Sequence, residues 1–176
     1  MTTAPEPVIL EVFRHHLWAN QKLFQFCEGL TPGQLASSAL GTYGSIYDTL
    51  HHIAVTEQWY LAEIRSERRV DSILRNHQPS APELRRHIEH TGGGLIEVVR
   101  TLTITDFARW SDRGQEESML AVRLVIQTID HAMEHRTQIR TILSQIGVTP
   151  PEVDGWAYDA AQPDKGAYLD DGARNS

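Results

Sequence analysis

A chain of 176 residues, of which 40% are apolar and 22% charged, has the size and composition of a single folded domain. Its formal charge of -7, from 16 basic and 23 acidic residues, argues against a surface that binds nucleic acid. The single cysteine, Cys27, excludes an internal disulfide and a cysteine-rich zinc site, so histidines and carboxylates are the candidate metal ligands.

Neither a membrane span nor an export signal is indicated. The sequence has no run of about 18 uncharged apolar residues. It starts Met-Thr-Thr-Ala-Pro-Glu-Pro, without the basic region and apolar stretch of a signal peptide. We therefore expect a cytoplasmic protein, with neither a membrane nor nucleic acid among its partners.

Two long helices are predicted in the first half of the chain. Apolar residues recur with helical spacing from Val8 to Leu30, and Thr31-Pro32-Gly33 ends that helix. Further along, Ser45 followed by Asp48 is typical of an N-cap with an acid in the first turn. This cap predicts a second helix over Ile46 to Arg69.

Two more helices are predicted in the second half. The third runs from Pro82 to about Leu102, although Gly92 to Gly94 interrupt its pattern. Because each interior glycine costs about 1 kcal/mol relative to alanine, we expect this helix to be bent, locally frayed or packed closely against a neighbour. Asp106 to Glu117 is predicted as a loop. The strongest helical pattern follows, from Ser118 to Ile146, and Gly147 ends it.

Four long amphipathic helices without alternating strands predict an all-α four-helix bundle. We assign residues 1–158 to this bundle and residues 159–176 to an acidic C-terminal tail. The chain after Pro151 is expected to lie across the bundle through Trp156 and Tyr158, and to be disordered beyond about Asp164.

Two of the nine histidines lie one helical turn apart on the last helix, at His131 and His135. At about 100° per residue they fall at the edge of the apolar arc, in line with Leu124 and Ile142. Two imidazoles placed like this can chelate one metal. Chance alone gives roughly 0.5 such pairs in a chain of this composition, so two ordinary helix histidines remain an alternative.

The second helix offers a third ligand. His51 and His52 point about 100° apart, so one of them can join the site. His52 shares its face with Asp48 and Glu63, whereas His51 points more nearly away from the apolar stripe, so His52 is the better candidate. Spacing alone also allows a surface histidine bonded to Asp48 or Glu63.

Several segments resemble motifs of the DinB/YfiT-like metalloenzyme family. Ser45-Ile-Tyr-Asp-Thr-Leu-His-His52-Ile, with Glu57 and Trp59 downstream, is similar to the second-helix motif of that family. The C-terminal block is similar to the family's His-x-x-x-His-Arg-Gly-Gln-Ile and Gly-x-x-Pro-Pro-x-x-Asp pattern; it comprises His131-Ala-Met-Glu-His135-Arg136-Thr137-Gln138-Ile139, Gly147, Pro150-Pro151 and Asp154. Trp18-Ala19-Asn20 resembles the family's opening helix, and the resemblance spans most of residues 8 to 158.

The resemblance implies an up-down-down-up bundle in which His52, His131 and His135 bind one divalent transition metal. Zinc and nickel are the first choices for that metal, and iron and manganese come next. Thr137 stands where the family usually has glycine, a departure that bears on the shape of the pocket rather than on the ligands. Characterised family members include low-molecular-weight thiol transferases and a thiol-dependent isomerase. A small-molecule substrate and a small thiol are therefore the implied partners.

Three neutral imidazoles leave coordination positions open, which is typical of a catalytic metal site. Such a site can activate a water, polarise a carbonyl or lower the pKa of a thiol. Cys27 is predicted to be a core residue, so the thiol is expected to come from a cosubstrate. Asp48 and Glu63 are expected to support His52, and no residue is assigned as a catalytic group.

The alternatives are a non-catalytic metal-binding or structural homodimer and a metal-dependent hydrolase. A homodimer is expected under every hypothesis, because Tyr47, Ala54 and Val55 widen the apolar surface of the second helix beyond one core face. Arg136 and Arg140 lie on the apolar side of the last helix and are expected to cross an interface or to pair with buried acids such as Glu57.

Overall fold

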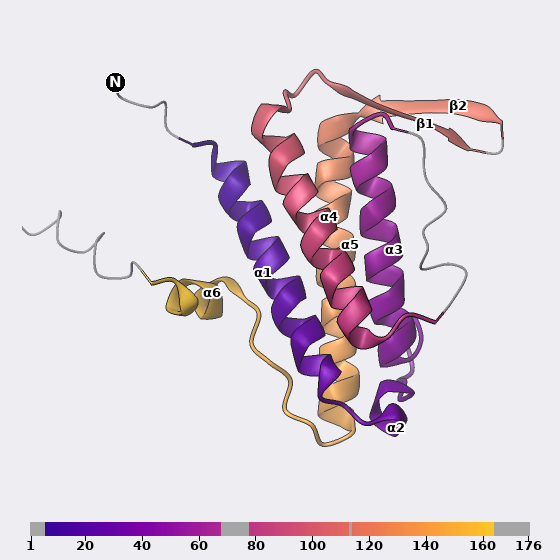
Figure 1. Cartoon of the computed structure of the whole chain (residues 1–176), viewed down its shortest axis with the longest axis vertical. Coiled ribbons are helices and arrows are strands. Elements are labelled where there is room, and N and C mark those ends of the chain that lie inside the picture. Colours follow the sequence, from indigo (N-terminus) through magenta and orange to yellow (C-terminus); the bar gives the residue numbers. More distant parts are fainter. Residues whose placement is uncertain (1–5, 68–77, 113, 164–176) are drawn as a thin grey trace, which may run out of the picture.

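Four long helices lie side by side in the computed structural model, which describes residues 6–67, 78–112 and 114–163 (Figure 1). They are α1 (Val8–Glu28), α3 (Ile46–Ile64), α4 (Ala81–Thr101) and α5 (Ala121–Gln145). Two short helices, α2 (Pro32–Leu35) and α6 (Gly155–Ala161), flank them. Helices α1 and α5 run in one direction and α3 and α4 in the other, so the expected up-down-down-up order is confirmed.

The start of α3 follows the predicted capping pattern. Ser45 Oγ accepts a hydrogen bond from the Asp48 N–H at 3.1 Å, and Asp48 Oδ2 accepts one from the Ser45 N–H at 3.2 Å. The helix ends earlier than predicted, because Ser66 adopts a left-handed conformation with φ 54°. The Glu67 N–H then bonds to the Ala62 carbonyl, which closes a Schellman motif. Arg69, the predicted end, lies outside the described residues.

Helix α4 runs unbroken through its three glycines, because two of them lie against neighbouring helices. A Cβ at Gly92 would lie 2.6 Å from Leu17 Cδ1 of α1, and one at Gly94 would lie 2.7 Å from Leu61 Cδ2 of α3. Of the three alternatives expected for this helix, close packing against a neighbour is confirmed. A bend or local fraying is not needed to explain the glycines.

Gly93 provides a matched contrast with Gly92, since a Cβ at Gly93 meets nothing within 4 Å. We expect Gly93→Ala to raise the free energy of unfolding by about 1 kcal/mol through helix propensity. Gly92→Ala should lose this gain, because the Leu17 side chain must move. Urea unfolding of both variants measures the difference, and equal stabilisation by the two changes would contradict this account of the packing.

The segment predicted as a loop at 106–117 is instead a β-hairpin, so the prediction was wrong there. Strand β1 (Phe107–Asp112) pairs antiparallel with β2 (Gln115–Leu120), with Phe107 opposite Leu120. Gly114 supplies the positive φ that a tight hairpin turn needs. As a consequence, α5 begins at Ala121 rather than at Ser118.

The hairpin escaped detection because it has little alternating hydrophobicity. Among the hairpin residues whose burial is described, Ala108 alone is fully buried, whereas Phe107 beside it is 50% exposed. A strand pattern is recognised by an apolar face, and a single small residue does not make one.

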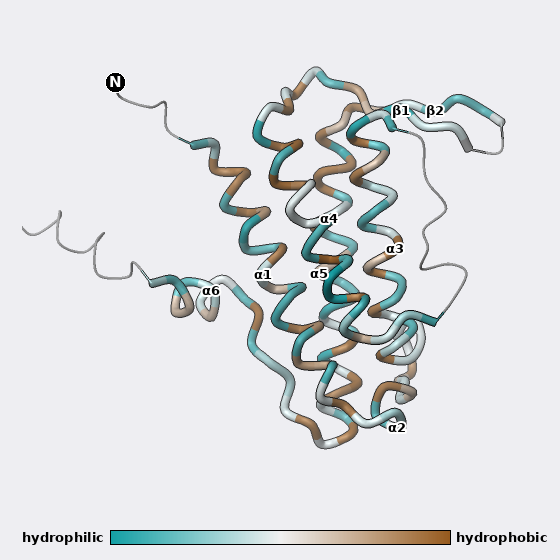
Figure 2. The backbone as a smooth tube through the Cα atoms, in the orientation of Figure 1, coloured by the Kyte–Doolittle hydropathy of each residue, from teal (hydrophilic) through white to brown (hydrophobic). Residues whose placement is uncertain are grey.

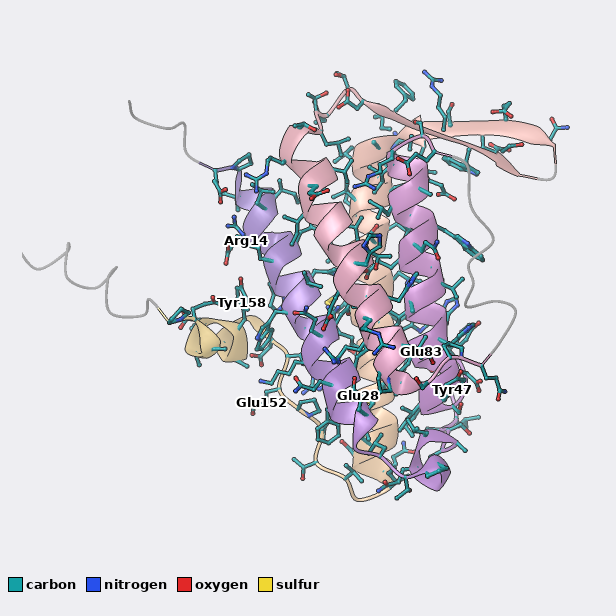
Figure 3. The ribbon with its side chains drawn as sticks, viewed as in Figure 1. Arg14, Glu28, Tyr47, Glu83, Glu152 and Tyr158 are labelled. Atoms are coloured by element: carbon teal, nitrogen blue, oxygen red, sulfur yellow. The ribbon has the colours of Figure 1, made fainter. Side chains whose placement is uncertain are left out.

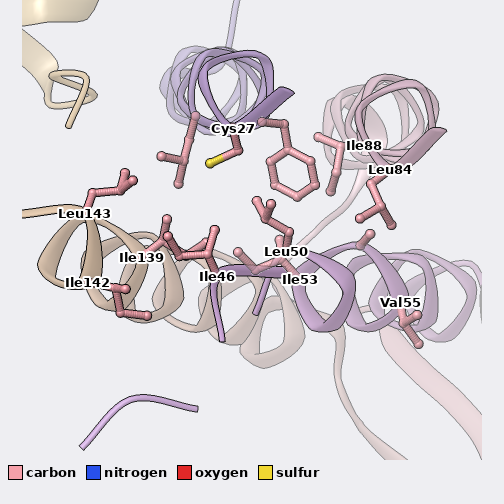
Figure 4. Packing of buried hydrophobic residues seen from close by; sticks show 13 residues of the cluster. Cys27, Ile46, Leu50, Ile53, Val55, Leu84, Ile88, Ile139, Ile142 and Leu143 are labelled. Atoms are coloured by element: carbon pink, nitrogen blue, oxygen red, sulfur yellow. The ribbon is translucent and has the colours of Figure 1, made fainter. Parts of the chain in front are cut away.

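The core consists of two clusters stacked along the bundle, and apolar residues recur along each long helix (Figure 2). The cluster nearer the end of α1 contains Cys27 and residues of α3, α4 and α5 (Figure 4). Cys27 is fully buried, as predicted. Ala54 and Val55 also lie inside this core, so they no longer favour a homodimer, which remains a prediction.

The segment after α5 folds back onto α1. The Tyr158 hydroxyl donates to Glu11 at 2.8 Å, and its ring packs edge-on against Trp18 at 5.3 Å between centroids (Figure 3). Trp156, in contrast, is 85% exposed. The predicted anchoring is therefore right for Tyr158 and wrong for Trp156, while the expected disorder beyond about Asp164 lies outside the described residues.

No helix in the described part of the chain combines the length and the apolar character that a bilayer span requires.

Candidate metal centre

The three predicted ligands lie together on the side of the bundle where α5 packs against α3. His131 and His135 occupy successive turns of α5, and His52 faces them from α3. One nitrogen of each imidazole lies within 4.8 Å of the other two. His52 Nε2 and His131 Nε2 are 3.0 Å apart. The three histidines are close enough to bind one metal ion.

The spacing of these nitrogens fits a metal. A zinc ion with bonds of about 2.1 Å holds its donor atoms roughly 3.4 Å apart. The 3.0 Å between the Nε2 atoms of His52 and His131, and the 4.8 Å within which all three nitrogens lie, are compatible with that value. His135 Nδ1 lies 3.0 Å from Gln138 Oε1, which can only accept a hydrogen bond. The proton of this imidazole is therefore on Nδ1, and Nε2 keeps its lone pair for a metal.

Two of the three imidazoles are also in the protonation state that a metal needs. Burial, with the neighbouring imidazoles of His135 and His51, lowers the pKa of His52 to about 4. Burial, with His135 and His52, likewise lowers the pKa of His131 to about 4. Neutral imidazole binds a metal whereas imidazolium does not, so His52 and His131 are prepared for a cation at neutral pH.

Two tyrosine rings flank the histidines. Tyr43, just before α3, stacks on His52 with ring centroids 4.0 Å apart. Tyr60 meets His131 edge-on at 5.7 Å. The phenol oxygen of Tyr60 accepts a 3.4 Å hydrogen bond from Gln127 Nε2, which ties this ring to α5. Neither ring was predicted from the sequence, because Tyr43 lies in a loop and the contact of Tyr60 with His131 joins two different helices.

The comparison with protein families decides which family this fold represents. The model of the DinB family matches residues 1–166. The chain belongs to the DinB family. Among solved structures it is similar to a DinB-like protein from Bacillus cereus, at 17% identity and a TM-score of 0.63, over 83% of this chain and 95% of that one. This likeness supports the DinB fold. No curated protein matches the chain.

Of the two groups expected to support His52 in this DinB chain, Asp48 has a different role, and support from Glu63 stays a prediction. Asp48 uses its carboxylate to cap α3 through Ser45, so its expected support of His52 was wrong. The nearest described partner of His52 Nδ1 is Thr56 Oγ1, at 3.5 Å.

Thr137, the departure from the DinB motif, is exposed and donates to the Met133 carbonyl, so it presses on no neighbouring helix.

Trp59 lines a cavity of about 150 Å³ between α3 and α4, together with His87 and His90. This cavity is separate from the three histidines, none of which lines it. Trp59 also packs against the core, so its ring lies between the core and this cavity.

A buried polar network of the DinB chain centres on Glu57, on the opposite side of α3. Glu57 is 2% exposed and accepts hydrogen bonds from His16 and Asn20, each at 2.9 Å, and from Thr91 at 3.0 Å. Asn20 Oδ1 accepts in turn from Arg136 Nη1 at 2.7 Å. The expected pairing of Arg136 with Glu57 is thus realised through a bridging amide.

Proposed function

We propose that this DinB-family chain is a metal-dependent enzyme of the thiol transferase or isomerase type. It holds one divalent transition metal on His52, His131 and His135, with zinc or nickel as first choice, and acts on a small molecule with a low-molecular-weight thiol. The convergence of three imidazoles carries the proposal, because three uncharged ligands leave open coordination positions and keep the full charge of the cation.

The bound metal would supply Lewis acidity that lowers the pKa of a coordinated thiol. The chain itself contributes positioning. Gln138 keeps Nε2 of His135 turned toward the other imidazoles, and the rings of Tyr43 and Tyr60 cover two sides of the cluster. The described residues place no cysteine near the histidines, since Cys27 lies in the core, so a thiol has to be brought by a cosubstrate.

The inertness of Cys27 is itself testable. Burial raises the pKa of its thiol to about 12, so little thiolate exists at pH 8. We expect iodoacetamide to alkylate Cys27 in the native protein at least about 100-fold more slowly than in 8 M urea. Mass spectrometry of timed samples measures both rates. Rapid alkylation of the native protein would assign a reactive thiol to the chain and remove the need for a cosubstrate.

The proposed function is tested in two stages on full-length protein without a histidine tag. The first stage measures zinc and nickel content after remetallation, and we expect about one equivalent per chain. The second follows conjugation of cysteine or glutathione to a fluorogenic alkyl halide, with the Cys27→Ser variant as control for the protein's own thiol. We expect a rate that is saturable in thiol and that disappears with the metal.

The outcomes separate the alternatives. One equivalent of metal without turnover of any thiol would support the non-catalytic metal-binding bundle, and metal-dependent ester or amide cleavage would support a hydrolase. No metal under remetallation conditions would contradict the proposal altogether. Light scattering of the same samples tests the expected homodimer.

A further inference from the structure

The loop between α2 and α3, residues 36–45, is joined to α5 by one side-chain amide. Gln138 Oε1 accepts a hydrogen bond from the Tyr43 backbone N–H at 3.0 Å and another from His135 Nδ1 at 3.0 Å. The amide cannot turn over freely, because its Nε2 donates to Glu134 Oε1 at 3.2 Å. A single oxygen therefore holds both a metal-ligating imidazole and the loop.

The loop is internally bonded, so it can respond as a unit. The Thr42 hydroxyl lies 2.8 Å from the Ala39 carbonyl and 3.1 Å from the Gly44 carbonyl. The Ile46 N–H bonds to the Ser37 carbonyl at 3.0 Å and closes the base of the loop. Gly41, with φ 84°, allows the reversal between these anchors. Displacement of the Tyr43 backbone therefore displaces its ring.

The Tyr43 ring lies at the histidine cluster. It stacks on His52 at 4.0 Å and meets His135 edge-on at 5.3 Å, while 54% of the residue remains exposed. It thus forms a solvent-facing wall of the site. Besides these ring contacts, the hydrogen bond from the Tyr43 N–H to Gln138 Oε1 holds Tyr43 in place.

We propose that Gln138 is a positioning residue that couples occupancy of the three-histidine site to the placement of Tyr43 beside it. The inference rests on the proposed metal binding and extends it. With a metal held by the three histidines, the Nδ1–H of His135 would be a stronger donor and the rotation of its ring would be fixed. Gln138 Oε1 is then held in the position from which it also accepts the Tyr43 N–H. The coupling is reciprocal: the factor by which a bound metal favours the ordered loop is the factor by which the ordered loop favours metal binding. Loosening the loop therefore weakens metal binding.

The coupling predicts how fast the Tyr43 amide exchanges with solvent. In 15N-labelled full-length protein, we expect saturation with zinc to slow exchange of the Tyr43 N–H by at least about 10-fold. In Gln138→Ala the Tyr43 amide should exchange rapidly with and without zinc, and zinc affinity should fall about 10-fold. Zinc alone is the probe, so no substrate or turnover is needed.

Two further variants separate positioning from a merely structural effect. Thr141→Ala alters an exposed residue three positions after Gln138, whose hydroxyl donates to the Thr137 carbonyl. It should change neither the exchange of the Tyr43 amide nor the zinc affinity. The double variant Glu134→Gln with Gln138→Glu reverses the donor and acceptor of that pair while keeping an acceptor for His135 and Tyr43. It should restore the zinc-dependent protection of Tyr43 that Gln138→Ala removes.

Two outcomes would overturn the coupling alone, and a third would overturn the proposed function as well. If wild-type protein binds zinc while exchange of the Tyr43 amide stays unchanged, the coupling is overturned and the metal site stands. If Gln138→Ala lowers zinc affinity but leaves the zinc-dependent protection of Tyr43 intact, the coupling is likewise overturned. If wild-type protein binds no zinc or nickel, the proposed function falls and the coupling falls with it.

Discussion

The His135→Ala variant is expected to bind zinc at least 100-fold more weakly than the wild type. Loss of groups that merely support a ligand costs about 10- to 100-fold in affinity, so loss of a direct ligand should exceed that range. His52→Ala and His131→Ala should behave alike. A zinc competition assay with a chromophoric chelator measures the three affinities.

The matched control is His51→Ala, which removes the neighbouring imidazole of α3. His51 is not among the three clustered histidines, and its ring centroid lies 6.3 Å from that of Tyr47. Its removal should leave zinc affinity within about 2-fold of wild type. Circular dichroism should show unchanged helix content in all four variants, because the core does not depend on the metal. Loss of zinc from His51→Ala and retention by His52→Ala would contradict the site.

Glu57→Leu is expected to lower the free energy of unfolding by about 3–5 kcal/mol. Arg136 is 6% exposed, and burial lowers its pKa to about 10 although Glu57 acts in the opposite direction, so the guanidinium stays charged at neutral pH. Without Glu57 this buried charge loses the carboxylate that compensates it, and the donors of His16 and Asn20 lose the oxygen that accepts from them. Urea unfolding at pH 7 measures the loss.

Two comparisons isolate the buried charge. Adding Arg136→Met to Glu57→Leu should recover at least about 1 kcal/mol, since removing both charges costs less than removing one. Glu89→Gln, which disrupts a pair with Arg85 near the surface, should change stability by less than about 1 kcal/mol. If the Glu57→Leu protein were as stable as Glu89→Gln, the buried network would contribute no more to the free energy of unfolding than a surface ion pair.

The helices were predictable because their signals are local. The apolar period and the Ser45 and Asp48 cap placed α3, and Gly147 marked the end of α5 within two residues. The end of α3 was missed because it depends on a left-handed serine, Ser66, which is not a usual terminator. The hairpin was missed because one buried alanine, Ala108, produces no alternating pattern.

The histidine cluster was predictable in part. The pair on α5 follows from a four-residue spacing, and His52 from the resemblance together with its helix face. The position of Tyr43 did not follow, because its bond to Gln138 joins residues 95 apart in sequence. The Glu57 network also unites three helices besides its own, and no periodicity within one helix reports such contacts.

The division of the histidines between α3 and α5 sets the order of events during synthesis. When the ribosome has released the chain only as far as the hairpin, the nascent protein carries His52 without either partner. Two of the three donors arrive together, in the last third of the sequence. A metal held by all three histidines would therefore bind only after α5 has been made, and it could not act as a nucleus for folding of the earlier helices. Cellular metal supply would then affect the metal content of this protein far more than its yield.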